Sequence, residues 1–193
     1  APMKDDTPTV VLGVNDDILT GDMPIVSNAS CTTNCIAPVI KVIHEALGVE
    51  NLLVSSVHAF TASQNLLDNK TNEDGDFRRA RAATLSVIPT KTGAVKACAY
   101  MAFFLSRAVT PDEINAKLEA AASSGSMKNI LSVSSEECVS IDFQTDPHSS
   151  IVDKNFTKVI DDRAVQLLSW YDNEWGYAMR VTELLQKMIS LAS

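Results

Sequence analysis

Two residues of this sequence could together carry out nucleophilic catalysis. Cys31 follows a run of small polar residues and precedes apolar residues at helical spacing, so we expect it at the start of a helix. There the helix dipole and the free backbone N–H groups favour the thiolate, which is the reactive form of cysteine. His58 follows an apolar run and could pair with the thiolate and later pass on a proton. Each residue alone is more often structural, as a buried cysteine near a turn or a lone histidine in a strand.

The other cysteines and histidines favour structural roles. Cys35 lies one helical turn after Cys31, on the same face, where an inert packed thiol is the usual case. Four cysteines would allow two disulfides by count, but the sequence shows no apolar region of a secretory signal, so we expect free thiols. A zinc site is disfavoured because only one close cysteine pair and no close histidine pair occur.

Hydroxyl, glycine and arginine residues at several places could bind anions. Helix starts present backbone N–H groups without helical partners, and arginine adds charge and a bidentate geometry. Ordinary helix capping and a solvated loop are the alternative explanation for each position. The candidates are Ser30, Thr61, Thr92, Gly93, Arg79 and Arg81.

The segment at residues 169–177 combines aromatic side chains with Asn, Asp and Glu. Aromatic residues with polar groups often line a ligand pocket, but they also serve as core and interface anchors. Both interpretations stay open from the residues alone.

Composition and charge limit the function classes. The 193 residues suffice for one sizeable domain, or for a domain plus part of another, with a core that needs no disulfides. A net charge of -8, a pI near 4.8 and the lack of a long Lys/Arg run argue against nucleic-acid binding. The longest apolar stretches fall short of the ~20 residues that cross a membrane. We expect a cytoplasmic protein, with a plastid or another organelle as the alternative.

Hydrophobic patterns predict the elements that position these residues. We expect short strands at 8–14 and 24–26, then a helix over 31–47. Strands are predicted at 52–61 and 83–90, separated by a polar loop at 68–76 and the basic cluster at 78–81. The segment from residue 94 onward is compatible with a helix.

The later part of the chain has clearer boundaries. Residues 110–113 form a capping box with proline at the first helical position, which predicts a helix to about Ser123 with Gly125 just beyond it. Strands are expected at 129–133, 138–143 and 164–170, and an amphipathic helix over 181–192. This order predicts an α/β or α+β fold, a sheet with helices on one face.

Five motifs together resemble the glyceraldehyde-3-phosphate dehydrogenase family. They are SNASCTTNC at 27–35, VHAFT at 57–61, RRARAA at 78–83, PTKTGA at 89–94 and WYDNEWGY at 170–177, in the family's order. The resemblance covers nearly the whole chain and implies the fold of the family's C-terminal domain, with a mixed, mainly antiparallel sheet. It also implies a catalytic domain at 28–175, a C-terminal helix at 176–193 and, at 1–27, the closing edge of a nucleotide-binding domain.

The resemblance implies an activity, the oxidation and phosphorylation of glyceraldehyde 3-phosphate to 1,3-bisphosphoglycerate. Cys31 would attack the aldehyde, hydride would pass to NAD or NADP, and inorganic phosphate would cleave the resulting thioester. His58 would lower the pKa of the thiol and act as general base. A homotetramer is implied as well. The matching substrate-binding and phosphate-binding positions are Ser30, Thr32, Thr61, Arg79, Thr92 and Gly93, and the cofactor-binding positions are Asn173 and Tyr177.

Two departures from the family pattern stand out. The Gly-rich phosphate loop of the nucleotide-binding half has no counterpart, so we expect this chain alone to bind NAD weakly. Near residues 98–108 roughly two dozen residues of the family have no equivalent, including an arginine that contacts the substrate phosphate. We therefore expect an exposed apolar segment at 98–105, or a partner that covers it.

Two other functions remain possible from the sequence. The chain could be a catalytically incomplete family member that serves as a structural or binding subunit of a larger assembly. It could also be a cysteine hydrolase that uses Cys31 and His58 without NAD.

Overall fold

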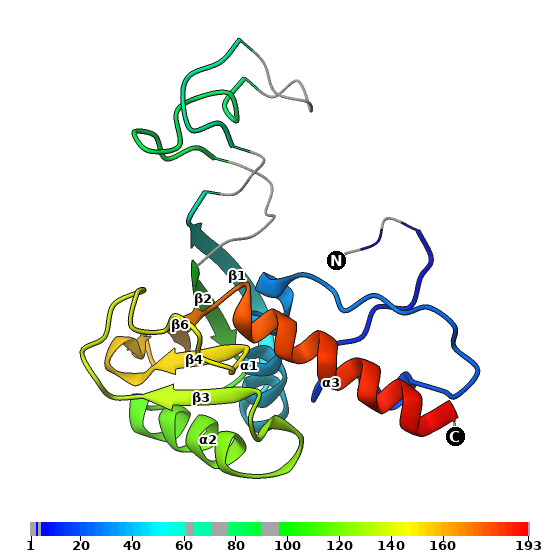
Figure 1. Ribbon diagram of the computed structural model, residues 1–193. Coiled ribbons are helices and arrows are strands. Elements are labelled where there is room, and N and C mark those ends of the chain that lie inside the picture. Colours follow the sequence, from blue (N-terminus) through cyan, green and yellow to red (C-terminus); the bar gives the residue numbers. More distant parts are fainter. Residues whose placement is uncertain (1–2, 4, 61–63, 71–76, 90–96, 193) are drawn as a thin grey trace.

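The structure is a computed structural model that describes residue 3 and residues 5–60, 64–70, 77–89 and 97–192 (Figure 1). Three α-helices and six strands lie in these ranges. The helices are α1 (Cys31–Leu47), α2 (Pro111–Ser123) and α3 (Trp175–Ala192). The strands are β1 (Val49–His58), β2 (Ala97–Leu105), β3 (Leu131–Ser134), β4 (Ser150–Asp153), β5 (Lys158–Ile160) and β6 (Ala164–Tyr171).

All six strands belong to one sheet, in the order β1-β2-β6-β4-β3, with β5 paired to β6. Every pairing is antiparallel except that of β3 with β4. The expected fold, a mixed and mainly antiparallel sheet in an α+β domain, is therefore confirmed.

Helices α1 and α2 cover one face of the sheet, and the core lies between them and the strands (Figure 1). In β2 the side chains alternate: Met101, Phe103 and Leu105 are fully buried in this core, whereas Tyr100 and Phe104 are exposed on the other face. The prediction of an exposed apolar segment at 98–105 was thus wrong for Cys98, Ala99, Met101, Phe103 and Leu105, which are buried. Met101, Phe103 and Leu105 are buried because the helices cover this face of the sheet. The prediction that the segment from residue 94 onward is compatible with a helix was also wrong for residues 97–105, which form β2.

Local capping sets the helix boundaries as predicted. The Ser30 hydroxyl accepts a hydrogen bond from Thr33 N and starts α1, and Gly48, with a φ of 74°, ends it. The Thr110 hydroxyl accepts a hydrogen bond from Glu113 N at 3.2 Å, so the predicted N-cap of α2 is confirmed. The Glu113 carboxylate, which would complete the capping box, binds Arg107 instead.

The N-terminal residues do not form the strand expected at 8–14. Only a bridge joins Thr9 to Ser27, and the turns that follow place Val10 and Leu12 against Leu184 of α3. The apolar residues that suggested a strand are buried by a helix rather than by a sheet.

The strands expected at 24–26, 138–143 and 83–89 do not form, and the one expected at 129–133 is shifted. Residues 138–143 form turns, because the Asp142 carboxylate accepts a hydrogen bond from Val139 N at 2.8 Å. Strand β3 begins at Leu131 rather than at 129, since Asn129 has a φ of 66°, which a strand does not allow. Residues 83–89 form a turn and coil, with Leu85 and Val87 exposed.

No helix among the described residues is long and apolar enough to span a lipid bilayer.

Candidate active site

A strained turn leads into α1 and fixes its first residue. Ala29 has a φ of 56°, in the left-handed region that alanine rarely adopts. The Asn34 side-chain amide donates hydrogen bonds to the carbonyls on both sides of Ala29, at 2.8 and 2.9 Å. The Tyr177 hydroxyl donates to the Ala29 carbonyl at 3.1 Å. Three consecutive carbonyl groups are therefore held in place immediately before Cys31.

Cys31 is the first residue of α1 and is only 6% exposed. At the first and second helical positions, the N–H groups of Cys31 and Thr32 point out of the helix end without a carbonyl one turn earlier. Burial raises the pKa of the Cys31 thiol, while hydrogen bonds from the Thr32 backbone and hydroxyl act in the opposite direction. The thiol is therefore protonated at neutral pH in this arrangement.

His58 is the last residue of β1 and is half-buried. Its Nδ1 lies 3.1 Å from the Ala59 carbonyl oxygen, which favours the tautomer with the proton on Nδ1 and leaves Nε2 as the basic nitrogen. Burial lowers the pKa of His58 from 6.5 to about 4. The imidazole is therefore neutral at pH 7 and able to accept a proton.

Tyr171, at the end of β6, adjoins both residues. Its hydroxyl lies 2.7 Å from the Thr32 hydroxyl, in the first turn of α1. Its ring meets the His58 ring edge-on, with centroids 6.1 Å apart and an interplanar angle of 81°. Cys31 belongs to the same buried cluster as Tyr171. Tyr171 thus packs in one cluster with Cys31 and contacts the ring of His58, the two residues that the sequence singled out.

The second cysteine of α1 is packed in a buried polar environment. The Cys35 sulfur lies 3.5 Å from the Ser169 hydroxyl and 3.8 Å from that of Ser150. Burial raises the pKa of Cys35 to about 12, so this thiol is inert at neutral pH. All four cysteines are free, as predicted.

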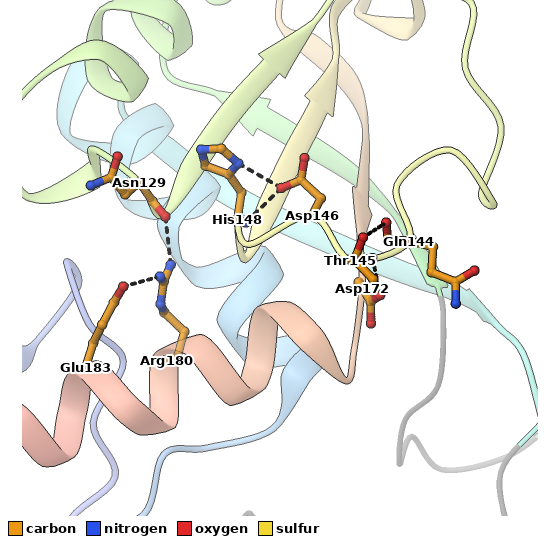
Figure 2. A network of polar contacts seen from close by, with 8 residues as sticks. All are labelled: Asn129, Gln144, Thr145, Asp146, His148, Asp172, Arg180 and Glu183. Atoms are coloured by element: carbon orange, nitrogen blue, oxygen red, sulfur yellow. Dashed lines mark hydrogen bonds and ion pairs between the residues drawn. The ribbon is translucent and has the colours of Figure 1, made fainter.

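The loop between β6 and α3 carries Asn173 and is held by Asp172. One carboxylate oxygen of Asp172 accepts hydrogen bonds from Glu174 N and Trp175 N, at 2.8 and 3.0 Å. The other oxygen accepts from Thr145 N at 2.8 Å, a contact drawn in Figure 2. Asp172 therefore caps α3 and fixes the position of Asn173, which is buried.

Helix α3 is anchored a further turn along by Arg180 (Figure 2). This side chain is almost fully buried, and it donates to the Asn129 carbonyl at 2.9 Å and to the Glu183 carboxylate at 2.7 Å. The anchor also holds Tyr177, one turn earlier on α3, close to the Ala29 turn. No sequence signal pointed to Arg180, because an arginine on an amphipathic helix is usually solvated.

The residues expected to bind phosphate are only partly described. Thr61, Thr92 and Gly93 lie outside the described residues. Ser30 and Thr32 adjoin Cys31, and the Ser30 hydroxyl lies 2.7 Å from that of Thr33. Arg79 is on a segment that extends away from the sheet (Figure 1). Among the described members of this predicted set, Ser30 and Thr32 thus lie at the start of α1, and Arg79 lies in the segment at residues 77–89.

Within the described ranges, no group of three or more His, Cys, Asp and Glu side chains is arranged to hold a metal ion.

Comparison with known proteins identifies relatives. Residues 30–102 and 99–173 match the family model of the glyceraldehyde 3-phosphate dehydrogenase C-terminal domain. The chain is 44% identical over 210 residues to glyceraldehyde-3-phosphate dehydrogenase of Mycobacterium tuberculosis H37Rv, covering 96% of the chain and 60% of the relative. It is 42% identical over 214 residues to the protein of that name from Borreliella burgdorferi, covering 97% and 63%.

These comparisons also locate the internal difference that the sequence suggested. The two matched segments meet at residues 99–102, within β2, and the 210-residue alignment is longer than the 193-residue chain. The relatives therefore carry additional residues at an internal position. The chain spans about three fifths of the length of the curated relatives that it matches.

Proposed function

Because this chain belongs to the glyceraldehyde-3-phosphate dehydrogenase family, we propose that it carries the catalytic domain of the phosphorylating enzyme, with Cys31 as nucleophile and His58 as base. The observation that supports this proposal most directly is that Tyr171 contacts both the first turn of α1 and the His58 ring. In this proposal residues 28–175 form the catalytic domain, residues 176–193 its last helix, and residues 1–27 the edge of a nucleotide-binding domain.

The chemistry begins with a proton transfer. His58 Nε2 takes the proton of the Cys31 thiol, and the sulfur forms a bond to the aldehyde carbon of glyceraldehyde 3-phosphate. The carbonyl oxygen gains negative charge in this step, and the N–H groups at the start of α1 stabilise it. The proton on His58 Nε2 then passes to this oxygen, which gives the thiohemiacetal on Cys31, and the neutral imidazole can take the hydroxyl proton back in the next step.

The oxidation requires NAD or NADP, which accepts the hydride when bound and leaves a thioester on Cys31. The residues present fit the nicotinamide end of this cofactor. Asn173 offers a side-chain amide on a loop fixed by Asp172, and Tyr177 is anchored at the Ala29 turn beside Cys31.

Inorganic phosphate then attacks the thioester carbon, and the carbon–sulfur bond breaks to give 1,3-bisphosphoglycerate and the Cys31 thiolate. The hydroxyl groups of Ser30 and Thr32 and the start of α1 support binding of this anion. Thr61, Thr92, Gly93 and Arg79 complete the proposed binding set for the two phosphate groups.

Assembly with other chains is part of the proposal. The sheet face that α1 and α2 leave open carries Leu53 and Val57 of β1, 69% and 60% exposed, and Phe104 of β2. A contiguous apolar face of this kind is typical of a buried interface. A homo-oligomer is the first choice, and the cytoplasm the first choice of compartment, with an organelle as the alternative.

A second candidate function is a structural or binding subunit without turnover. The residues that the relatives carry within β2, and that this chain lacks, favour it. Under this alternative the residues around Cys31 are inherited from an active ancestor but do not turn over substrate. The open face of the sheet then binds the other chains of the assembly.

Thiol labelling tests the proposal on this chain as it exists. The protein is treated with limiting iodoacetamide at pH 7.5, and each cysteine peptide is quantified by mass spectrometry. We expect Cys31 to react first, although Cys138 is more exposed, and we expect a Cys31→Ser variant to lose the fast phase. Equal labelling of all four thiols would contradict the proposal.

Turnover separates the two candidates. NADH or NADPH formation is followed with glyceraldehyde 3-phosphate, inorganic phosphate and either cofactor. Phosphate-dependent formation that disappears in Cys31→Ser supports the enzyme. Fast Cys31 labelling without turnover favours the structural subunit.

A further inference from the structure

We propose that Tyr171 is a positioning residue that holds the His58 imidazole at a fixed place relative to the first turn of α1. This inference rests on the proposed function, because it assigns a purpose to the geometry of Cys31 and His58. Tyr171 itself touches neither substrate nor cofactor in this proposal. It acts through the two residues that it contacts.

The sheet register places Tyr171 opposite His58. His58 of β1 pairs with Ala97 of β2, and Ala97 pairs with Tyr171 of β6, so the three residues form one row across the sheet. Neighbouring strands lie about 4.8 Å apart, so the backbones of β1 and β6 are close to 10 Å apart. The ring centroids of His58 and Tyr171 are nevertheless only 6.1 Å apart, and the rings meet edge-on. The two side chains thus lean toward each other across β2.

The hydroxyl of Tyr171 contacts the residue next to the candidate nucleophile. It lies 2.7 Å from the Thr32 hydroxyl, and both residues are buried. Thr32 immediately follows Cys31 and offers the hydrogen bonds that favour the Cys31 thiolate. The ring of Tyr171 packs in the same cluster as Cys31 and Ala99. One side chain therefore joins the end of β1 to the start of α1.

Packing alone does not account for this arrangement. The hydroxyl of a buried tyrosine needs one hydrogen-bond partner. Buried hydroxyl groups also occur at Ser150 and Ser169 in the same region, but these two bond to each other. Tyr171 instead bonds to the residue next to the candidate nucleophile and places its ring against the candidate base. Burial raises the pKa of Tyr171, so the hydroxyl stays protonated and neutral across the working pH range.

His58 is only half-buried, so contacts with neighbouring side chains are needed to orient its ring. His58 ends β1, and its Nδ1 has the neighbouring Ala59 carbonyl as partner, which limits but does not fix rotation of the ring. The edge-on contact with the Tyr171 ring restrains the imidazole further. Without the ring we expect the imidazole to turn away from the position that it holds beside Tyr171.

The test is the pH dependence of Cys31 alkylation by iodoacetamide in the full chain. The wild type is compared with Tyr171→Leu, His58→Asn and the double variant, with peptide mass spectrometry as readout. A base that shifts the thiol equilibrium by one pKa unit changes the rate about tenfold at neutral pH. We expect Tyr171→Leu and His58→Asn each to lower the rate about tenfold, with superimposable pH profiles, and the double variant to lose nothing more.

If the rate of Cys31 alkylation in the double variant falls by the product of the two single losses, Tyr171 acts independently of His58. That result would overturn the proposal. Tyr171→Phe is the matched control, because it keeps the ring and removes the hydroxyl. Because the ring stays against His58 while the contact with Thr32 is lost, we expect Tyr171→Phe to lower the rate less than Tyr171→Leu and to keep the wild-type pH profile. A loss as large as that of His58→Asn would overturn the proposed role of the ring, also where Tyr171→Leu does not fold.

The same data keep the two proposals apart. If the wild type labels Cys31 no faster than the other cysteines, the proposed function fails. If the wild type labels Cys31 first and the losses multiply, only the role of Tyr171 fails.

Discussion

The side-chain amide of Asn34 holds Ala29 in the left-handed region by bonding to the carbonyl groups on both sides of it, at 2.8 and 2.9 Å. Because Asn34 lies one turn into α1, the helix that carries Cys31 also stabilises the strained turn before it. The turn and the helix start are therefore one cooperative unit.

Replacing Asn34 tests this coupling. Asn34→Ala removes two buried hydrogen bonds. The Asn28 carbonyl loses this donor, whereas the Ser30 carbonyl keeps the backbone N–H of residue 34 at 2.9 Å, so we expect the free energy of unfolding to fall by about 1–3 kcal/mol. Iodoacetamide labelling of Cys31 should slow as well, because the turn relaxes. Chemical denaturation measures the first effect. Asn51→Ala, at an exposed position of β1, is the control and should change stability by less than about 0.5 kcal/mol.

Alanine substitutions at two glycines with positive φ can distinguish the cost of backbone strain from the cost of a steric clash. Gly48 ends α1 with a φ of 74°, and a Cβ there would lie 2.5 Å from the Ser106 hydroxyl oxygen. Gly125 has a φ of 64°, and a Cβ there would have open space within 4 Å.

Gly125→Ala should therefore cost only the backbone term, about 1 kcal/mol, and Gly48→Ala clearly more. Thermal melts of both variants under identical conditions decide the matter. Equal losses would mean that Ser106 moves aside without cost.

The elements that the sequence predicted well carry their signal locally. The capping hydroxyls of Ser30 and Thr110 and the terminating Gly48 define α1 and α2 without reference to the rest of the molecule. Strands β4 and β5 were missed because they have only four and three residues, and their pairing with β6 defines them. The strand predicted at 138–143 failed for the converse reason, since a side chain at Asp142 competes for the backbone.

The candidate site divides in the same way. Cys31 and His58 were predictable because their residue types and positions imply chemistry. Tyr171 was not, although it lies in a quoted motif, because its contacts depend on the register of three strands and on the packing of α1 against them. Side-chain relationships between distant elements are the part that local patterns do not encode.

Asp172 should control both the start of α3 and the loop that carries Asn173. Asp172→Asn keeps one acceptor oxygen but turns an NH₂ group toward an N–H donor, at either Thr145 or the helix start. We expect a loss of about 1–3 kcal/mol, and a larger loss for Asp172→Ala.

Urea unfolding measures these losses, with Asp161→Asn at an exposed turn as control. In an assembly that turns over, Asp172→Asn should also raise KM for the cofactor more than it lowers kcat, because Asn173 loses its fixed position. An unchanged KM would separate Asp172 from the cofactor.

Acid sensitivity provides the last prediction, and its sign follows from His58. Burial lowers the pKa of His58 to about 4, while the unfolded chain has a value near 6.5. Between these values the unfolded state binds a proton that the folded state does not, so the free energy of unfolding falls as the pH drops from 6.5 toward 4. His58→Gln removes this proton and should flatten the dependence in that window, while the steeper loss below pH 4, where hydrogen-bonded carboxylates with a lowered pKa such as Asp146 protonate, should persist. Denaturation midpoints at half-unit intervals from pH 4 to 7 measure the effect. A variant that retains the full slope between pH 6.5 and 4 would show that His58 is protonated in the folded chain, which would favour a resting ion pair with the Cys31 thiolate over the neutral pair described above.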